Sequence, residues 1–170
     1  MKFRDFMSDR LAIWEICVLM RMTAKAAGRK APSLQRLTRQ DSLRQYIDFT
    51  AGVISEMDEH KRGTLRRNMY DRAFAVGRFL GRLPGRKSNA AKAKMIRRLY
   101  RNIGISINGD MPGIISVPRC AFSASYTPEI CHVMSGVDSG IICGIFGGGN
   151  LEFTQRLTEG CQVCKAVYRR

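Results

Sequence analysis

The sequence predicts an α+β fold, in which a helical N-terminal half is followed by a small antiparallel sheet with one long helix packed on it. Apolar residues recur with helical spacing through residues 1–102. After that the period changes to the alternation typical of strands, first in residues 103–107. A long helical segment, residues 127–146, then separates two pairs of alternating segments. At 170 residues the chain can build a core of its own, so we expect a single domain, residues 1–170, made of a basic helical part (1–102) and a cysteine-rich α+β part (103–170).

Four helices are expected in the basic helical part. Each contains apolar residues at helical spacing between breaks that are polar or contain glycine and proline. They cover residues 7–27, a segment from Ser33 or Asp41 to about Met57, residues 65–83 and residues 88–102. Ser8 and Ser88 have the side chains of N-caps, and Pro84-Gly85 ends the third helix.

In the cysteine-rich part, turn residues separate the expected elements. The strands are residues 103–107, residues 114–122 with Pro118 limiting this strand to an edge or a bulge, residues 151–157 and residues 163–168. The helix between them starts with Thr127 as N-cap and Pro128 as its first residue, and it stops at the glycines after residue 146. Gly136, Gly140 and Gly144 share one side of this helix, so we expect a neighbouring backbone to approach closely there.

The net charge of +15 belongs to the N-terminal part of the chain. Residues 1–106 hold 24 Lys and Arg against 9 Asp and Glu, whereas residues 107–170 hold 5 of each. This charge is either that of solvated helix faces or that of a surface that attracts an anionic substrate, an acidic partner or nucleic acid. The sequence contains no helix-turn-helix or RNA-binding motif, so nucleic-acid binding is supported by charge alone.

The apolar segments favour a cytoplasmic protein without a membrane span. No uninterrupted apolar run approaches the roughly 20 residues that a membrane-crossing helix needs. Residues 11–20 resemble the core of a signal peptide but contain Glu15, so we interpret them as part of an amphipathic helix. In a reducing compartment the 6 cysteines are expected as thiols, core residues or metal ligands. An apolar face left over on the first helix would favour a homodimer.

Five cysteines lie in the cysteine-rich part and suggest a metal site. Cys161-x-x-Cys164 at the mouth of the last hairpin resembles half of a structural zinc site. Cys120 and Cys131 would complete a zinc or iron site, with His132 as a substitute ligand. The spacing differs from that of standard zinc fingers, and small buried cysteines of the core are the alternative interpretation.

Nucleophilic catalysis is a second hypothesis for the same residues. The Cys131 thiolate would attack an electrophilic carbon, with His132 or Asp138 as the base. Because neighbours in a helix point about 100° apart, Cys131 and His132 cannot both face one site well. Cys131, Met134, Ser135 and Asp138 do share one face of the helix, which makes Cys131 and Asp138 the better pair. Each polar residue in this set also has a purely structural interpretation.

Two residues near the last hairpin are candidates for substrate binding. Arg156 lies in the third predicted strand, between apolar neighbours, and its guanidinium can hold a substrate carboxylate through two hydrogen bonds. The alternative for Arg156 is the solvent-facing side of an amphipathic strand. Glu159 is either a second substrate contact or a residue of the turn formed with Gly160.

The order of Cys120, Cys131, Asp138, Arg156 and the segment Glu159-Gly160-Cys161-x-x-Cys164 resembles the C-terminal half of the L-2-amino-thiazoline-4-carboxylic acid hydrolase family. More distantly, it is similar to V4R domains, which are small-molecule-binding modules. The helical half fits the family only in its architecture. The resemblance covers about 50 residues, and Cys161 and the glycines after residue 146 have no secure counterpart.

The hydrolase resemblance implies hydrolytic opening of a cyclic amidine in a small carboxylate substrate. On this chain we assign activation to Cys131 or a bound metal, proton transfer to Asp138, and the substrate carboxylate to Arg156. The V4R resemblance implies instead a module that senses a small molecule or a metal without catalysis. A third hypothesis is a basic accessory protein that docks an acidic partner or nucleic acid through residues 1–106.

Overall fold

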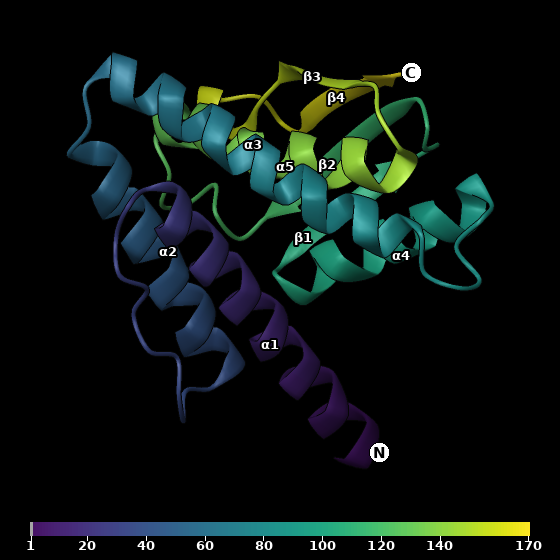
Figure 1. Cartoon of the computed structure of the whole chain (residues 1–170), viewed down its shortest axis with the longest axis horizontal. Helices are drawn as coiled ribbons and strands as arrows, with labels where there is room; N and C mark the ends of the chain where they lie inside the picture. Colours follow the sequence, from purple (N-terminus) through teal and green to yellow (C-terminus); the bar gives the residue numbers. More distant parts are fainter. Residues whose placement is uncertain (1) are drawn as a thin grey trace.

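The computed structural model describes the backbone of residues 2–170 and the side chains of residues 9–170. Four helices are followed by two strands, a fifth helix and two further strands, which confirms the predicted α+β class (Figure 1). The elements are α1 (Lys2–Ala26), α2 (Arg39–Ser55), α3 (Glu59–Gly81), α4 (Asn89–Asn102), β1 (Ile105–Gly109), β2 (Ile114–Cys120), α5 (Pro128–Phe146), β3 (Asn150–Gln155), the short 3-10 helix η1 (Leu157–Glu159) and β4 (Cys164–Arg169).

Side-chain caps fix the starts of four helices. Thr38, Asp58, Ser88 and Thr127 each accept a hydrogen bond from the backbone N–H three residues further on. The predicted caps Ser88 and Thr127 are therefore confirmed. α5 ends as predicted, at Gly147, whose φ of 87° lies in the left-handed region that favours glycine.

Three predicted helix starts were wrong. α2 starts at Arg39 because Thr38, and not Ser33 or Asp41, provides the cap. α3 starts at Glu59 rather than residue 65, since the Asp58 cap outweighs the weak break at Gly63. α1 starts at Lys2, so Ser8 lies within the helix rather than at its start; no Gly or Pro interrupts residues 2–8.

The four strands form one antiparallel sheet in the order β1-β2-β4-β3. β2 is a central strand, yet its pairing with β4 stops at Val117. On the other side the register of β1 against β2 shifts between Ser106 and Asn108, opposite Pro118. The predicted bulge at Pro118 is thus present, whereas an edge position is not, because the irregularity accommodates the proline inside the sheet.

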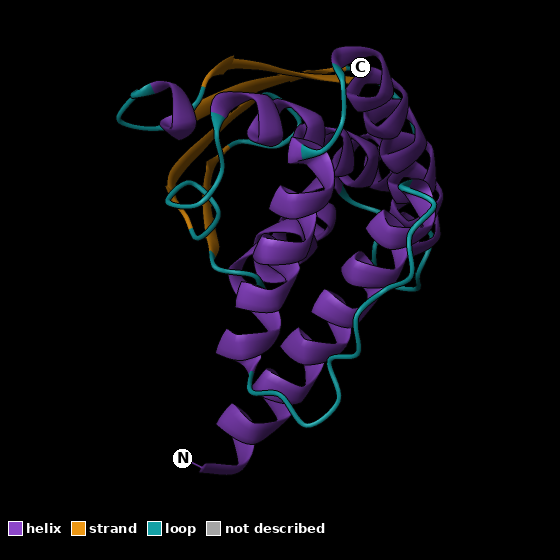
Figure 2. Ribbon diagram, turned by 90° about the vertical axis from the view of Figure 1, so that its left-hand side faces the viewer, coloured by secondary structure: helices purple, strands orange, loops and turns teal. Residues whose placement is uncertain are grey.

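α5 is the central helix of the fold and is covered by α3 along its length and by the sheet. The contact between α3 and α5 is the most extensive between any two elements, and Figure 2 shows the sheet on one side of the helices. α1 and α2 lie side by side and extend away from the sheet (Figures 1 and 2). One cluster of buried side chains reaches from Ile16 in α1 to Tyr168 in β4, so the helical part and the sheet share a core.

Glycines allow the close contact between α3 and α5, as the spacing of Gly136, Gly140 and Gly144 predicts. A Cβ atom added at Gly136 would lie 2.6 Å from the backbone oxygen of Arg66, and one at Gly140 would lie 2.5 Å from that of Tyr70. Real Cβ atoms do not approach backbone oxygens so closely. The two backbones therefore touch in a way that any larger residue would prevent.

The burial of α5 also bears on the expectation that no segment crosses a membrane. Of the helices in the described part of the chain, α5 is the one with the length and apolar composition for a membrane span, and 78% of its most apolar window is buried inside the fold. A core helix has the same properties. Because Glu129 and Asp138 interrupt its apolar residues, α5 contains no long uninterrupted apolar run. The absence of a membrane span stays a prediction.

Candidate functional site

A cavity of about 220 Å³ lies among α1, α3, α4, α5 and the adjoining end of the sheet. Most of its lining is apolar, and this part includes Leu19, Val76, Leu80, Leu99 and Met134. An apolar cavity of about 150 Å³ is already large enough to hold a benzene molecule. The cavity in this protein can therefore hold a compact organic ligand.

Two exposed aromatic residues belong to the wall of this cavity. Trp14 of α1 has an exposed fraction of 61% and Phe79 of α3 one of 66%. Together with Ile114, they are the large hydrophobic residues most exposed among the described side chains. Since both reach the solvent and line the cavity, they mark the side from which a ligand enters.

The inner wall is formed by one face of α5. Cys131, Met134, Asp138 and Ile141 follow the helical repeat and all line the cavity. The structure thus brings Cys131 and Asp138 to the same cavity, as their spacing in the sequence predicts. Ser135 is turned away from it, toward the guanidinium of Arg156.

Asp138 is one of two carboxyl groups among the described residues that line this cavity. It lies deep in the protein but keeps accessible surface, because it faces the cavity. The hydroxyl of Tyr100 donates a hydrogen bond to its Oδ1 over 2.9 Å. Burial raises the pKa of Asp138 from 3.8 to about 6, while the hydrogen bond from Tyr100 and the charge of Arg156 act in the opposite direction. At neutral pH the carboxyl is therefore mainly ionised, although it is shielded from bulk water.

Aromatic residues surround this carboxyl. The negative charge of Asp138 contributes to the raised pKa values of Tyr46, Tyr100 and Tyr126, although burial is the main cause in each case. The ring of Phe122 contacts those of Tyr46 and Tyr126, with centroid distances of 6.1 Å and 5.4 Å. All four rings line the cavity, so its polar end is an aromatic cluster around one carboxyl.

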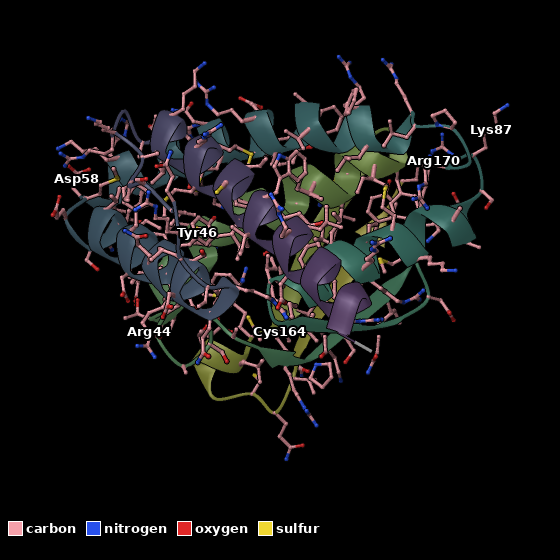
Figure 3. All side chains as sticks on the ribbon, turned by 90° about the horizontal axis from the view of Figure 1, so that it is seen from below. Arg44, Tyr46, Asp58, Lys87, Cys164 and Arg170 are labelled. Atoms are coloured by element: carbon pink, nitrogen blue, oxygen red, sulfur yellow. The ribbon has the colours of Figure 1, made fainter. Side chains whose placement is uncertain are left out.

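The Tyr46 hydroxyl forms no hydrogen bond of ordinary geometry with the described residues, although it lies near Thr23. Figure 3 shows Tyr46 in the interior of the fold, whereas Arg44 of the same helix points outward. By contrast, the Tyr126 hydroxyl is 2.5 Å from Oγ1 of Thr50. The Tyr46 hydroxyl has almost no accessible surface, so Tyr46 lines the cavity through its ring rather than through its hydroxyl.

The cavity contains two thiols and a second carboxyl. Burial raises the pKa of Cys120 to about 12, so its thiol stays protonated at neutral pH and is a poor nucleophile. Cys131 is half-buried and accepts a contact of 3.6 Å from Nη1 of Arg156. Glu15 accepts a hydrogen bond of 2.8 Å from the side chain of Asn102, and burial raises its pKa.

Arg156 lies outside the cavity lining, and its guanidinium is occupied by the protein itself. It is buried and contacts Ser135 over 3.4 Å, Cys131, and Oε1 of Glu159 over 3.7 Å. Its Cζ lies 4.4 Å from the centre of the Phe153 ring. The prediction of a strand through residue 157 was wrong, since β3 ends at Gln155 and Arg156 is the residue before η1. This turn directs the arginine inward, against α5.

The remaining candidates lie at the end of the sheet or at the surface. Cys164 starts β4 (Figure 3), and its sulfur accepts a hydrogen bond of 3.2 Å from the backbone N–H of Leu157. Cys161 is half-exposed in the preceding loop, Glu159 is exposed at the end of η1, and His132 is exposed on α5. Burial and the nearby arginines lower the pKa of His132. His132 therefore faces away from the cavity that Cys131 lines.

The predicted zinc or iron site of Cys120, Cys131, Cys161 and Cys164 is not formed as a ligand set here. Among residues 9–170, no three His, Cys, Asp or Glu side chains are grouped so that they could hold a metal ion. Cys120 and Cys131 line the cavity, whereas Cys161 and Cys164 do not. Metal binding by these cysteines stays a prediction.

Several residues of the cavity escaped the sequence analysis. Trp14 and Glu15 of α1, Tyr46 of α2, and Phe79 and Tyr100 of the next two helices were treated only as parts of helical patterns. Glu15 gave a signal, as a carboxylate inside an apolar segment, but it was used only to argue against a signal peptide. The tyrosines gave none, because tyrosine is common in helix cores.

Comparison with protein-family models gives no match for this chain, and comparison with curated proteins gives none either. The resemblance to the hydrolase family and to V4R domains therefore rests on the spacing of a few residues. The geometry of the cavity carries the functional argument.

Proposed function

We propose that this protein is a small-molecule-binding module, and that its ligand occupies the cavity among α1, α3, α4, α5 and the sheet. The single observation that carries this proposal is a cavity of about 220 Å³ whose wall is mostly apolar and includes the carboxyl of Asp138. Ligand sites in proteins have this composition, with apolar walls and a few polar groups that orient the ligand. Asp138 and the Tyr100 hydroxyl that is hydrogen-bonded to it are those polar groups.

The apolar wall supplies the affinity in this proposal. Removing apolar surface from water is worth about 25 cal/mol per Å², so a ligand that fills the cavity gains several kcal/mol before its polar end is considered. The exposed rings of Trp14 and Phe79 then become covered or partly covered. A function in ligand binding thus accounts both for the unfilled space and for the exposed aromatic residues beside it.

Binding of the neutral fluorescent probe N-phenyl-1-naphthylamine tests the proposal. We expect its fluorescence to rise with the wild-type protein and to rise far less with Val76→Trp, since Val76 is half-buried and lines the cavity. Ile114→Trp is the matched control, because Ile114 is 64% exposed and does not line the cavity. Equal fluorescence with both variants would show that the probe binds elsewhere and would remove the proposal.

Hydrolysis is a second candidate function, favoured by the presence of Cys131 and Asp138 in one cavity. An acid with a pKa of about 6 is suited to proton transfer near neutral pH. Against it, Arg156 is engaged by the protein and lies outside the lining. The described residues that line the cavity thus include no cationic anchor for a substrate carboxylate. Incubation with 2-amino-thiazoline-4-carboxylate is the test: a cysteine derivative that forms with wild-type protein and not with Asp138→Asn would establish the hydrolase.

A further inference from the structure

The charge inside the cavity is opposite to that of the chain. The protein has a net charge of +15, yet the charged side chains that line the cavity are the carboxylates Glu15 and Asp138, and no described Lys or Arg belongs to the lining. The two carboxylates differ in their partners. Glu15 is hydrogen-bonded by Asn102 and lies within the fields of Arg98 and Arg39, so more groups stabilise its charge than that of Asp138.

The negative charge of Asp138 is stabilised by fewer groups than that of Glu15. No ion pair involving Asp138 is found among the described side chains, and the one hydrogen bond it receives there comes from Tyr100, to Oδ1. Arg156 contributes a charge from the far side of Cys131 without touching the carboxylate. A buried carboxylate needs more than one hydrogen bond to offset the loss of water. A ligand in the cavity can donate a further hydrogen bond to Oδ2 of Asp138, the carboxylate oxygen that receives none from Tyr100.

Rings line the cavity around this carboxylate. Tyr46, Phe122 and Tyr126 form a contiguous cluster, and Tyr100 donates the hydrogen bond. Aromatic faces carry negative potential and attract cations, and the combination of rings with a carboxylate is the usual way in which proteins recognise ammonium groups.

From these observations we infer that the ligand is an apolar amine: a hydrocarbon chain or ring that lies against the aliphatic wall and ends in a protonated nitrogen bound to Asp138 within the aromatic cluster. This inference rests on the proposed function, because it specifies the chemical class of the ligand for the same cavity. It excludes a small carboxylate as the preferred ligand, since two carboxylates in the lining would repel it. The small anionic substrate expected from the net charge does not suit the cavity.

Three probes that share the same hydrocarbon chain but differ in their terminal group test the inference. Octylamine, octanol and octanoate are titrated into the protein by calorimetry at about pH 7.5, where the buried carboxylate is ionised. We expect octylamine to bind at least about tenfold more tightly than octanol, as a charge-assisted hydrogen bond of about 1.4 kcal/mol or more requires. Octanoate should bind more weakly than octanol.

Asp138→Asn keeps the shape and the acceptor for Tyr100 but removes the charge. It should bring the affinity for octylamine to within about twofold of that for octanol. If octanol binds wild-type protein as tightly as octylamine, and Val76→Trp still weakens octanol, the inference is wrong and the proposed function stands. If none of the three probes binds wild-type protein more tightly than Val76→Trp, both are wrong. The comparison of the probes on wild-type protein decides the question even where Asp138→Asn folds poorly.

Discussion

The Tyr100 hydroxyl and the Asp138 carboxyl join α4 to α5 at the polar end of the cavity, with 2.9 Å between the donor and the acceptor oxygen. Both residues come from helices whose remaining contacts with each other are few. The hydrogen bond stabilises the ionised form of Asp138 against the effect of burial. It therefore links the position of α4 to the charge inside the cavity.

Tyr100→Phe should raise the pKa of Asp138 further above its value of about 6, because the ionised carboxylate loses its donor. The free energy of unfolding at neutral pH should fall by about 1.5–3 kcal/mol, as for other hydrogen bonds to charged groups. The pKa is measured by following the carboxyl carbon in an NMR titration. Tyr126→Phe is the control, since the hydroxyl of Tyr126 contacts Thr50 rather than the carboxylate; an equal shift in both variants would contradict the assignment.

Asp138→Asn should change how stability depends on pH. The folded-state pKa of about 6 lies above the ordinary value of 3.8, so the folded protein holds the proton more tightly than the unfolded chain. At acid pH the protonated carboxyl therefore does not lower the free energy of unfolding. As the pH rises from about 4 to about 6, ionisation of Asp138 lowers the free energy of unfolding progressively, and above this range the loss stays constant. Its size is about 3 kcal/mol.

Urea unfolding from about pH 4 to about pH 7.5 measures this effect. As the pH rises across this range, Asp138→Asn should become progressively more stable relative to wild type. A constant difference would mean that the carboxyl has an ordinary pKa in the folded protein. Asp110→Asn is the matched control, since Asp110 is exposed in the β1–β2 turn, and its difference from wild type should remain small throughout.

Gly140→Ala should destabilise the protein, because the new methyl group would lie 2.5 Å from the backbone oxygen of Tyr70 and 2.7 Å from the Cβ of Ala73. Backbone atoms cannot yield as a flexible side chain does, so α3 and α5 must separate, at a cost of about 1–3 kcal/mol or more. Gly63→Ala, in the first turns of α3, has nothing within 4 Å of the new atom and should stabilise by about 0.5–1 kcal/mol. Thermal unfolding of both variants checks the opposite signs.

Arg156→Lys should lower the stability by about 1–3 kcal/mol, since lysine cannot reach Ser135, Cys131 and Glu159 together as the guanidinium does. Binding of a neutral probe in the cavity should be unchanged, because Arg156 is not part of the lining. If Arg156 instead anchors a substrate carboxylate, as the sequence predicts, Arg156→Lys should leave the stability unchanged and weaken the binding of a carboxylate. Chemical unfolding and probe titration on the same sample separate the two roles.

The fold could be predicted from local signals, whereas helix starts were less certain. Thr127, Pro128 and Gly147 fix α5 through interactions within a few residues, and these can be identified in the sequence. The start of α3 depends on whether Asp58 caps it or Gly63 breaks the helical pattern. The difference between these two options is about 1 kcal/mol, which the pattern of apolar residues alone does not resolve.

Only one wall of the cavity could be predicted. Cys131 and Asp138 share a face of one helix, so their spacing is enough to place them together. Glu15, Tyr46 and Tyr100 come from three other helices, and they line the same cavity as Asp138 only through tertiary packing, for which the sequence carries no local signal. Arg156 was misplaced for a related reason, since its direction depends on where β3 ends.

The glycine contact between α3 and α5 has a consequence for the size of ligand that the protein can accept. Helices whose backbones touch cannot slide or separate by small steps, so these two walls have a fixed spacing. α1 makes less extensive contacts with α3 and α4, and it carries Trp14 at the entrance. We therefore expect the protein to adapt to a longer or bulkier ligand by a shift of α1 rather than by a change in the spacing of α3 and α5.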